Sequence, residues 1–349
     1  MSTMTVGRGK QIARDWIREH VVGTPGVIGA VFHGSVNWLS DDAVLAPGSD
    51  LDILVVVGEG ARWVKPGKFA VDGVLMEVSD LPAGQISSGE QVLGDHALAG
   101  SFRDPHNIIV DPTGHLTAVV AVVAAHYADE EQVRRRMTSS QERILSGFMV
   151  RDETPFPDCV IHWAFPAAVT THVVLVAGLR NPTVRKRYLT TRDLLAEYGL
   201  ADRYALFLRL IGADRPAPDR IAAAMDELEA AFCDAARAIR SPFPFGADIS
   251  ADGWPVAIGG SRDLIAAGNA REAVFWMIVT WSRCMAVLTA DGTPDSYARH
   301  DEPYRRFLVE LGITSEADLR SRHAETLAAL PEVWSIAEDV LARNGNVRH

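Results

Sequence analysis

Three acidic residues in the first 80 positions of the chain are spaced as metal ligands would be. Asp50 and Asp52 begin an apolar run, and the two-residue period of a strand places both carboxylates on one face of a sheet. Two carboxylates held side by side repel each other, and Mg²⁺, which prefers hard oxygen ligands, relieves that repulsion. Glu77 interrupts a later apolar run, and an ionised glutamate in a buried strand is costly without a partner. We therefore expect Glu77 to be the third metal ligand. Asp80 is the alternative, although its position before Leu81 is more typical of a turn.

A possible phosphate site precedes these acids. The apolar run Val27–His33 ends in Gly34 and Ser35. A glycine has no side chain to hold an anion away from the main chain, and backbone N–H groups together with a hydroxyl can bind phosphate. The pair is therefore predicted to hold a phosphate group.

Strands and helices of the first third of the chain are expected to position these residues. Short apolar runs bounded by turn residues predict four strands: Val27–His33, Leu51–Val57, Lys68–Val78 and Ile108–Val110. Apolar residues at helical spacing predict two helices, one ending before Gly23 and one over Gln91–Leu98. The third strand is expected to pair with the second and so to bring Glu77 to the two aspartates.

The composition changes from about Leu116 onward. Ala, Leu, Arg and Glu dominate there, and proline or glycine separates long helical patterns. We expect a boundary between Tyr127 and Gln132, which divides the chain into residues 1–129 and 130–349. The predicted fold class is α/β (α+β), with a small mixed sheet flanked by helices in the first domain and an all-helical second domain.

The overall composition excludes several classes of protein. The 349 residues are 48% hydrophobic and 23% charged, which is not the composition of a disordered, collagen-like or coiled-coil chain. An excess of 45 acidic over 34 basic residues gives a formal net charge of −11. This charge disfavours nucleic-acid partners and favours small cationic ones.

Cysteine usage and hydropathy indicate where the protein works. Three widely spaced cysteines form no disulfide framework, and the N-terminus has no apolar secretion segment. The most apolar stretch, Ala273–Trp281, is far shorter than the roughly 20 residues that a bilayer span needs. We therefore expect a cytoplasmic protein with no membrane partner.

The order Gly34-Ser35, then Ser49-Asp50-Leu51-Asp52, then an acid on a later strand resembles the nucleotidyltransferase superfamily of the DNA polymerase β type. Within it, the acidic tetrad and the helical second domain are similar to those of the aminoglycoside nucleotidyltransferases. The resemblance is specific over about residues 28–57, moderate as far as residue 114 and architectural beyond.

This resemblance implies an enzyme that transfers AMP from ATP to a hydroxyl, with Mg²⁺ as cofactor and release of pyrophosphate. The acceptor would be a small molecule, such as an aminoglycoside-like antibiotic, and the protein would be a monomer or homodimer. Its catalytic and metal-binding residues would be the three acids, Asp50, Asp52 and Glu77. Its nucleotide ligands would include Gly34, Ser35 and Ser49.

A basic run in the second domain offers further nucleotide ligands. Arg185-Lys186-Arg187 opens a predicted helix and could clasp a triphosphate, with Lys186 and Arg187 as the candidates. The alternative is a solvated helix face with ordinary ion pairs. The sequence does not decide between the two.

Two other functions are open. The chain could adenylylate a protein partner, although such relatives are usually short, single domains. It could also be a non-catalytic nucleotide-sensing module, although such modules often lose an acid and all three are present here. The 14-residue connection between Ser35 and Asp50 is longer than usual in the superfamily, and we expect residues 37–47 to bulge at the mouth of the cleft.

Overall fold

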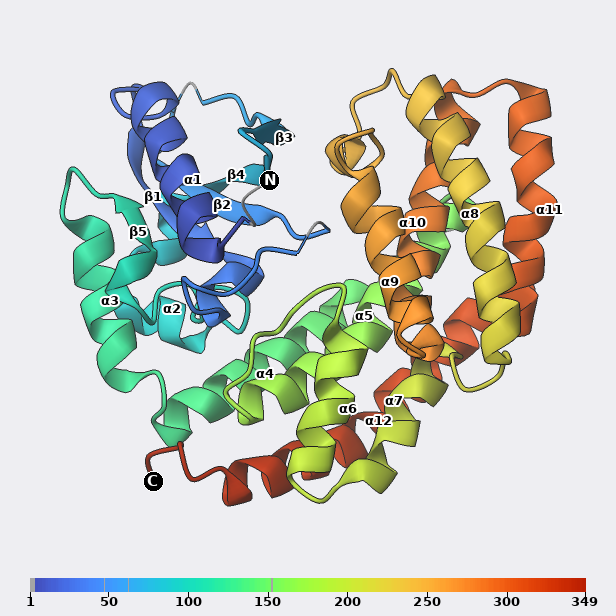
Figure 1. The fold of residues 1–349 in the computed structure, drawn as a ribbon. Helices are drawn as coiled ribbons and strands as arrows, with labels where there is room; N and C mark the ends of the chain where they lie inside the picture. Colours follow the sequence, from blue (N-terminus) through green and yellow to red (C-terminus); the bar gives the residue numbers. More distant parts are fainter. Residues whose placement is uncertain (1–3, 47, 62, 152) are drawn as a thin grey trace. The chain divides into compact units, whose positions relative to one another are not determined.

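The structure is a computed structural model that describes residues 4–46, 48–61, 63–151 and 153–349. The chain forms two compact units, whose elements are labelled in Figure 1. Residues 4–139, 179–183 and 345–349 form the α/β unit, and residues 140–178 and 184–344 form the helical unit. The division falls inside helix α4 (Glu130–Gly147), beyond the expected boundary at residue 129.

The α/β unit contains a five-stranded mixed sheet in the order β3-β4-β2-β1-β5. Its strands are β1 (Val27–His33), β2 (Leu51–Val57), β3 (Gly67–Val71), β4 (Val74–Pro82) and β5 (Ile108–Val110). Strand β4 runs parallel to β2, and the other neighbouring pairs are antiparallel. The prediction of a small mixed sheet is confirmed, and so are the bounds of β1, β2 and β5.

The third predicted strand is wrong, because residues 68–78 belong to two strands joined by a tight turn. Asp72 and Gly73 have φ angles of 48° and 79°, the left-handed conformation of a two-residue hairpin turn. Val71 pairs with Val74 directly across that turn. An Asp-Gly pair flanked by apolar residues is a strong hairpin signal, and it lies inside the predicted strand.

Apolar side chains cover both faces of the sheet. On one face, Ile12 and Ile17 of α1 (Val6–His20) join a buried cluster with alternate residues of β2, such as Ile53. On the other face, α2 (Gly89–Gly94) and α3 (His115–His126) join a second cluster with Val56. Because side chains alternate along a strand, Asp52 lies on the same face as Val56.

Of the two helices predicted for this unit, one is confirmed and the other has different bounds. The opening helix is confirmed as α1, which begins after the Thr5 cap and ends at His20. The second was predicted over Gln91–Leu98 but is α2, which begins earlier and ends at Gly94. It ends there because the Asp95 side chain accepts hydrogen bonds from the backbone N–H groups of the next turn, at 2.7 and 2.9 Å.

The long connection between β1 and β2 is anchored to the unit at several points, and the expected bulge over residues 37–47 at the mouth of a cleft stays a prediction. Asn37 is buried, and its side-chain amide donates a hydrogen bond to the Phe32 carbonyl at 2.7 Å. Leu45 is buried in the cluster beneath α1, and the Ala43 carbonyl accepts a hydrogen bond from the Val6 N–H. Position 47 of this connection lies outside the described residues.

The helical unit contains helices and, among its described residues, no strand. Besides the end of α4, it contains α5 (Phe156–Ala177), α6 (Arg187–Glu197), α7 (Tyr204–Ile211), α8 (Pro218–Ala238), α9 (Gly260–Ala266), α10 (Ala270–Asp291), α11 (Pro294–Glu310) and α12 (Glu316–Arg343). Strong caps fix several boundaries. At the start of α12, for example, the Ser315 hydroxyl and the Asp318 carboxylate accept each other's backbone N–H.

Two of these helices, α5 and α10, are long and apolar enough to cross a membrane by length and composition alone. The sequence analysis did not predict helices of this length and hydropathy, because charged residues interrupt the apolar run of α10. Most of each helix is buried inside the helical unit, as in the core helices of soluble proteins. The helices are therefore compatible with a soluble protein.

Candidate metal and nucleotide site

Four polar residues form a row across the sheet. Lys68 on β3 pairs with Glu77 on β4, which pairs in turn with Asp52 on β2. Asp52 is also paired with His33 on β1. Directly paired residues on neighbouring strands project from the same face of a sheet, so all four side chains lie on the face that α2 and α3 cover further along.

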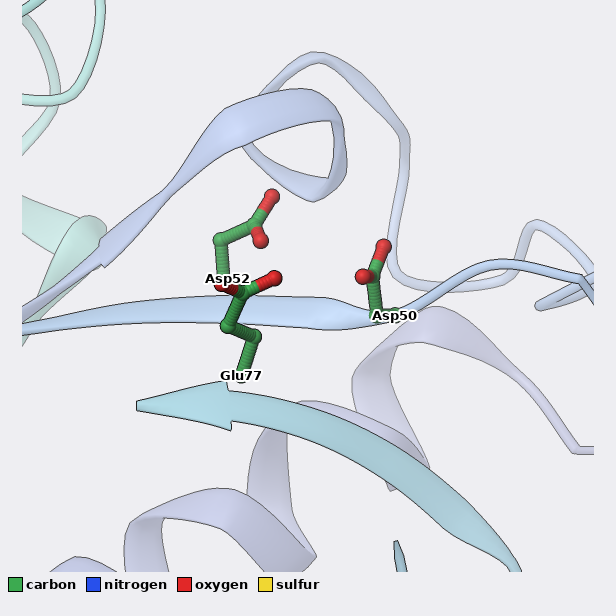
Figure 2. Close-up of side chains that lie close together, drawn as sticks. All are labelled: Asp50, Asp52 and Glu77. Atoms are coloured by element: carbon green, nitrogen blue, oxygen red, sulfur yellow. The ribbon is translucent and has the colours of Figure 1, made fainter. Parts of the chain in front are cut away.

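Asp50, one residue before β2, completes a group of three carboxylates with Asp52 and Glu77 (Figure 2). One oxygen atom from each lies within 4.8 Å of the other two. The side chains of Asp50 and Glu77 are 18% and 28% exposed, which leaves the group accessible from solvent. Three carboxylate oxygens at this spacing fit a divalent cation that prefers oxygen ligands. The structure thus brings together the three acids on which the sequence analysis relied.

The alternative third acid, Asp80, lies elsewhere. It follows Glu77 by three residues on β4, and an odd spacing along a strand places the two side chains on opposite faces. Asp80 is also exposed. This register favours Glu77 as the third ligand.

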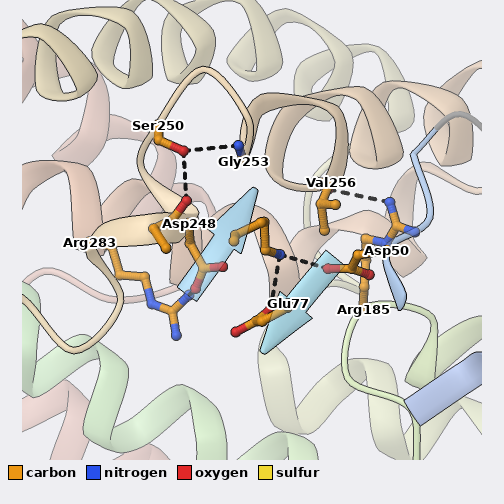
Figure 3. Close-up of polar contacts among 10 residues, drawn as sticks. Asp50, Glu77, Arg185, Asp248, Ser250, Gly253, Val256 and Arg283 are labelled. Atoms are coloured by element: carbon orange, nitrogen blue, oxygen red, sulfur yellow. Dashed lines mark hydrogen bonds and ion pairs between the residues drawn. The ribbon is translucent and has the colours of Figure 1, made fainter. Parts of the chain in front are cut away.

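Lys68 is the residue of this site that the sequence analysis missed. Its ammonium lies 2.7 Å from Asp50 Oδ2 and 3.1 Å from Glu77 Oε2, and Figure 3 marks both contacts. Its side chain is only 2% exposed. A buried ammonium held between two of the acids indicates that the group stabilises positive charge at this point.

Gly34 lies directly against Asp52. It begins the short 3₁₀ helix η1 (Gly34–Trp38) with a φ of +69°. A Cβ atom at position 34 would lie only 2.0 Å from Asp52 Oδ2. The Asp52 carboxylate can therefore lie where it does only because residue 34 has no side chain. The predicted phosphate-binding glycine and the predicted metal ligand are therefore neighbours.

The two serines predicted to bind nucleotide flank the same region. Ser35 follows Gly34 and is exposed. Ser49 precedes Asp50 in a turn, where its backbone N–H donates a hydrogen bond to the Ala46 carbonyl at 2.9 Å. Their roles as ligands stay predictions.

The basic candidates Lys186 and Arg187 belong to the helical unit. Arg187 is 1% exposed, and its guanidinium lies 4.3 Å from the centre of the Phe275 ring. Burial lowers the pKa of Arg187 to about 10. Such a core position gives no support to a phosphate contact by Arg187. Lys186 is exposed, whereas Arg185 donates a hydrogen bond to the Val256 carbonyl at 3.3 Å (Figure 3).

His33, at the end of the polar row, is held neutral by its surroundings. Its Nδ1 atom lies 2.7 Å from Ser101 Oγ. Burial lowers the pKa of His33 to about 4, and the nearby Asp95 carboxylate opposes this shift only in part.

We expect this histidine to make the protein less stable in mild acid. Its pKa is about 4 when folded and about 6.5 when unfolded, so between these values the unfolded chain binds more protons. The free energy of unfolding should fall as the pH is lowered from 6.5 to 4, by on the order of 2 kcal/mol, since some solvent contact reduces the full effect. Urea unfolding of wild type and of His33→Gln at several pH values checks this. A pH dependence that the variant retains in full would contradict it.

Comparison with protein-family models finds no match for the chain, and comparison with curated proteins finds none either.

Proposed function

We propose that the protein is a Mg²⁺-dependent nucleotidyltransferase that works in the cytoplasm and moves AMP from ATP to a hydroxyl of a small molecule. The observation that carries this proposal is the convergence of Asp50, Asp52 and Glu77 within 4.8 Å, beside Gly34. Phosphoryl-type transfer depends on positioning and on neutralising charge, and three carboxylates that hold a cation next to a phosphate-binding turn supply both.

In this proposal, Asp50, Asp52 and Glu77 hold the metal, which supplies positive charge to the triphosphate when bound. The Gly34 backbone and the Ser35 hydroxyl bind phosphate oxygens. The acceptor hydroxyl oxygen forms a bond to the α-phosphorus, and the bond from that phosphorus to the pyrophosphate oxygen breaks. The hydroxyl proton passes to the Glu77 carboxylate, which acts as general base and contributes about 10²–10⁴-fold.

The acceptor is proposed to be cationic, such as an aminoglycoside-like antibiotic. The formal net charge of −11 favours an acceptor rich in ammonium groups and disfavours nucleic acid.

Mass spectrometry tests this function directly. The purified protein is incubated with Mg²⁺, ATP and a panel of aminoglycosides, and we expect a product heavier by one AMP together with pyrophosphate. Omission of Mg²⁺ with added chelator is the control and should abolish the product. Absence of any product across the panel would contradict the antibiotic acceptor.

Radiolabelled ATP in a cell lysate separates the proposal from the two alternatives. We expect the label to enter the small-molecule fraction in a Mg²⁺-dependent way. Label on a protein would instead indicate protein adenylylation. Binding of ATP without any transfer would indicate a nucleotide-sensing module.

A further inference from the structure

The Lys68 ammonium contacts two of the three acids that could hold a metal ion. The chain reaches this arrangement through the β3–β4 hairpin, whose register pairs Lys68 with Glu77. The ammonium then contacts one oxygen of Glu77 and one oxygen of Asp50, at 3.1 and 2.7 Å. Asp50 directly precedes β2 and Glu77 lies on β4, so Lys68 joins acids from two neighbouring segments of the chain.

The burial of Lys68 makes this contact more than a surface ion pair. Its side chain is 2% exposed, and a buried ammonium without opposite charge nearby is costly. In return, the lysine reduces the formal charge of the group from −3 to −2 and so limits the repulsion among the acids. The ion pair therefore stabilises the site in the absence of a metal.

The same contacts oppose the binding of a divalent cation. A cation bound by the three acids needs oxygens that the ammonium now contacts, and two positive charges a few ångströms apart repel each other. Either the ammonium moves away from the carboxylates or the cation binds more weakly.

We propose that Lys68 is the resident counter-ion of the acidic group, which a divalent cation must displace from Asp50 and Glu77 in order to bind. This inference rests on the proposed function, because it assumes that the three acids hold a metal. Lys68 is then a positioning residue with two opposed effects: it keeps the acids in place in the metal-free protein, and it raises the metal concentration at which the site fills.

Mn²⁺ binding to the full chain tests this proposal, with free Mn²⁺ measured by electron paramagnetic resonance. We expect Lys68→Met to bind Mn²⁺ about tenfold more tightly than wild type, which corresponds to about 1.4 kcal/mol. Lys65→Met is the matched control, because Lys65 is an exposed lysine just before β3, and its substitution should leave the Mn²⁺ affinity unchanged. Lys68→Arg retains the charge and should bind Mn²⁺ as weakly as wild type.

Thermal unfolding gives a second readout that does not depend on catalysis. Without metal, Lys68→Met should melt below wild type, because the three acids lose their counter-ion. Added Mn²⁺ should raise the melting temperature of the variant more than that of wild type. If the methionine variant does not fold, Lys68→Gln serves in its place, since its amide can still donate a hydrogen bond to a carboxylate.

The outcomes separate this inference from the proposed function. If wild type binds Mn²⁺ and the neutral variants bind it equally or more weakly, the counter-ion role is overturned and the metal site stands. If wild type binds no Mn²⁺ at millimolar concentration and Asp52→Asn melts as wild type does with and without Mn²⁺, the metal site itself is overturned, and the counter-ion role with it.

Discussion

Replacing Asp52 by asparagine is expected to reduce nucleotidyl transfer by about 10³-fold. Asparagine keeps the shape of the side chain but removes one of the three negative charges that hold the cation, and loss of a preorganised charge next to the reacting phosphate is worth about 10²–10³ or more in rate. Asp52 is the central member of the group, since the register pairs it with Glu77 and its carboxylate lies against Gly34.

The loss should appear in activity and not in folding. Removal of one of three like charges relieves repulsion, so the melting temperature of metal-free Asp52→Asn should stay within a few degrees of wild type. Steady-state kinetics over a range of Mg²⁺ concentrations, together with thermal unfolding of the same samples, makes this comparison.

Asp80→Asn is the matched control for this prediction. It removes a carboxylate from β4 that is close to Glu77 in sequence but projects from the opposite face of the strand, where the Asp80 side chain itself is exposed. We expect its turnover to equal that of wild type. Wild-type turnover by Asp52→Asn would instead show that the acidic group does not perform the reaction.

The parts of the site that the sequence predicted share a physical reason. Strands β1 and β2 are short, rich in β-branched residues and bounded by turn residues, and both occur with the expected bounds. The two-residue period then predicts Asp50 and Asp52 on one face, and their carboxylates do lie together although Asp50 is one residue before β2. Glu77 was correctly expected to reach them because it is a charged residue within an apolar strand.

Lys68 was missed because one turn was missed. Once Asp72-Gly73 is taken as a two-residue hairpin turn, counting outward from it pairs Val71 with Val74 and Lys68 with Glu77. The Asp72-Gly73 turn could therefore have been predicted from the local sequence. The apolar residues on both sides of it favoured a single long strand instead.

The burial of Arg187, by contrast, could not be predicted from the local sequence. Three consecutive basic residues are typical of an exposed helix start, yet Arg187 packs on Phe275, which is distant in the sequence. Local pattern carries no information about such a partner. The same limit applies to α5, whose burial depends on the helices that pack around it.

Gly34→Ala is expected to impair both stability and activity, for two separable reasons. Residue 34 has a φ of +69°, and an L-residue other than glycine pays about 1–2 kcal/mol for a left-handed conformation. In addition, the new methyl group would lie 2.0 Å from Asp52 Oδ2 and 3.0 Å from Asp52 Cγ, so the carboxylate must move. A displacement of about 1 Å at a reacting centre can cost about 10²-fold in rate.

A second glycine separates these two effects. Gly60 has a φ of +74°, but a Cβ atom there would meet no atom within 4 Å. Gly60→Ala therefore carries the conformational cost alone, and we expect a similar loss in the free energy of unfolding with unchanged turnover and Mn²⁺ affinity. Gly34→Ala should lose about 10²-fold in turnover and should also bind Mn²⁺ more weakly, because Asp52 is displaced. Equal turnover in the two variants would show that the contact between Gly34 and Asp52 does not set the geometry of the site.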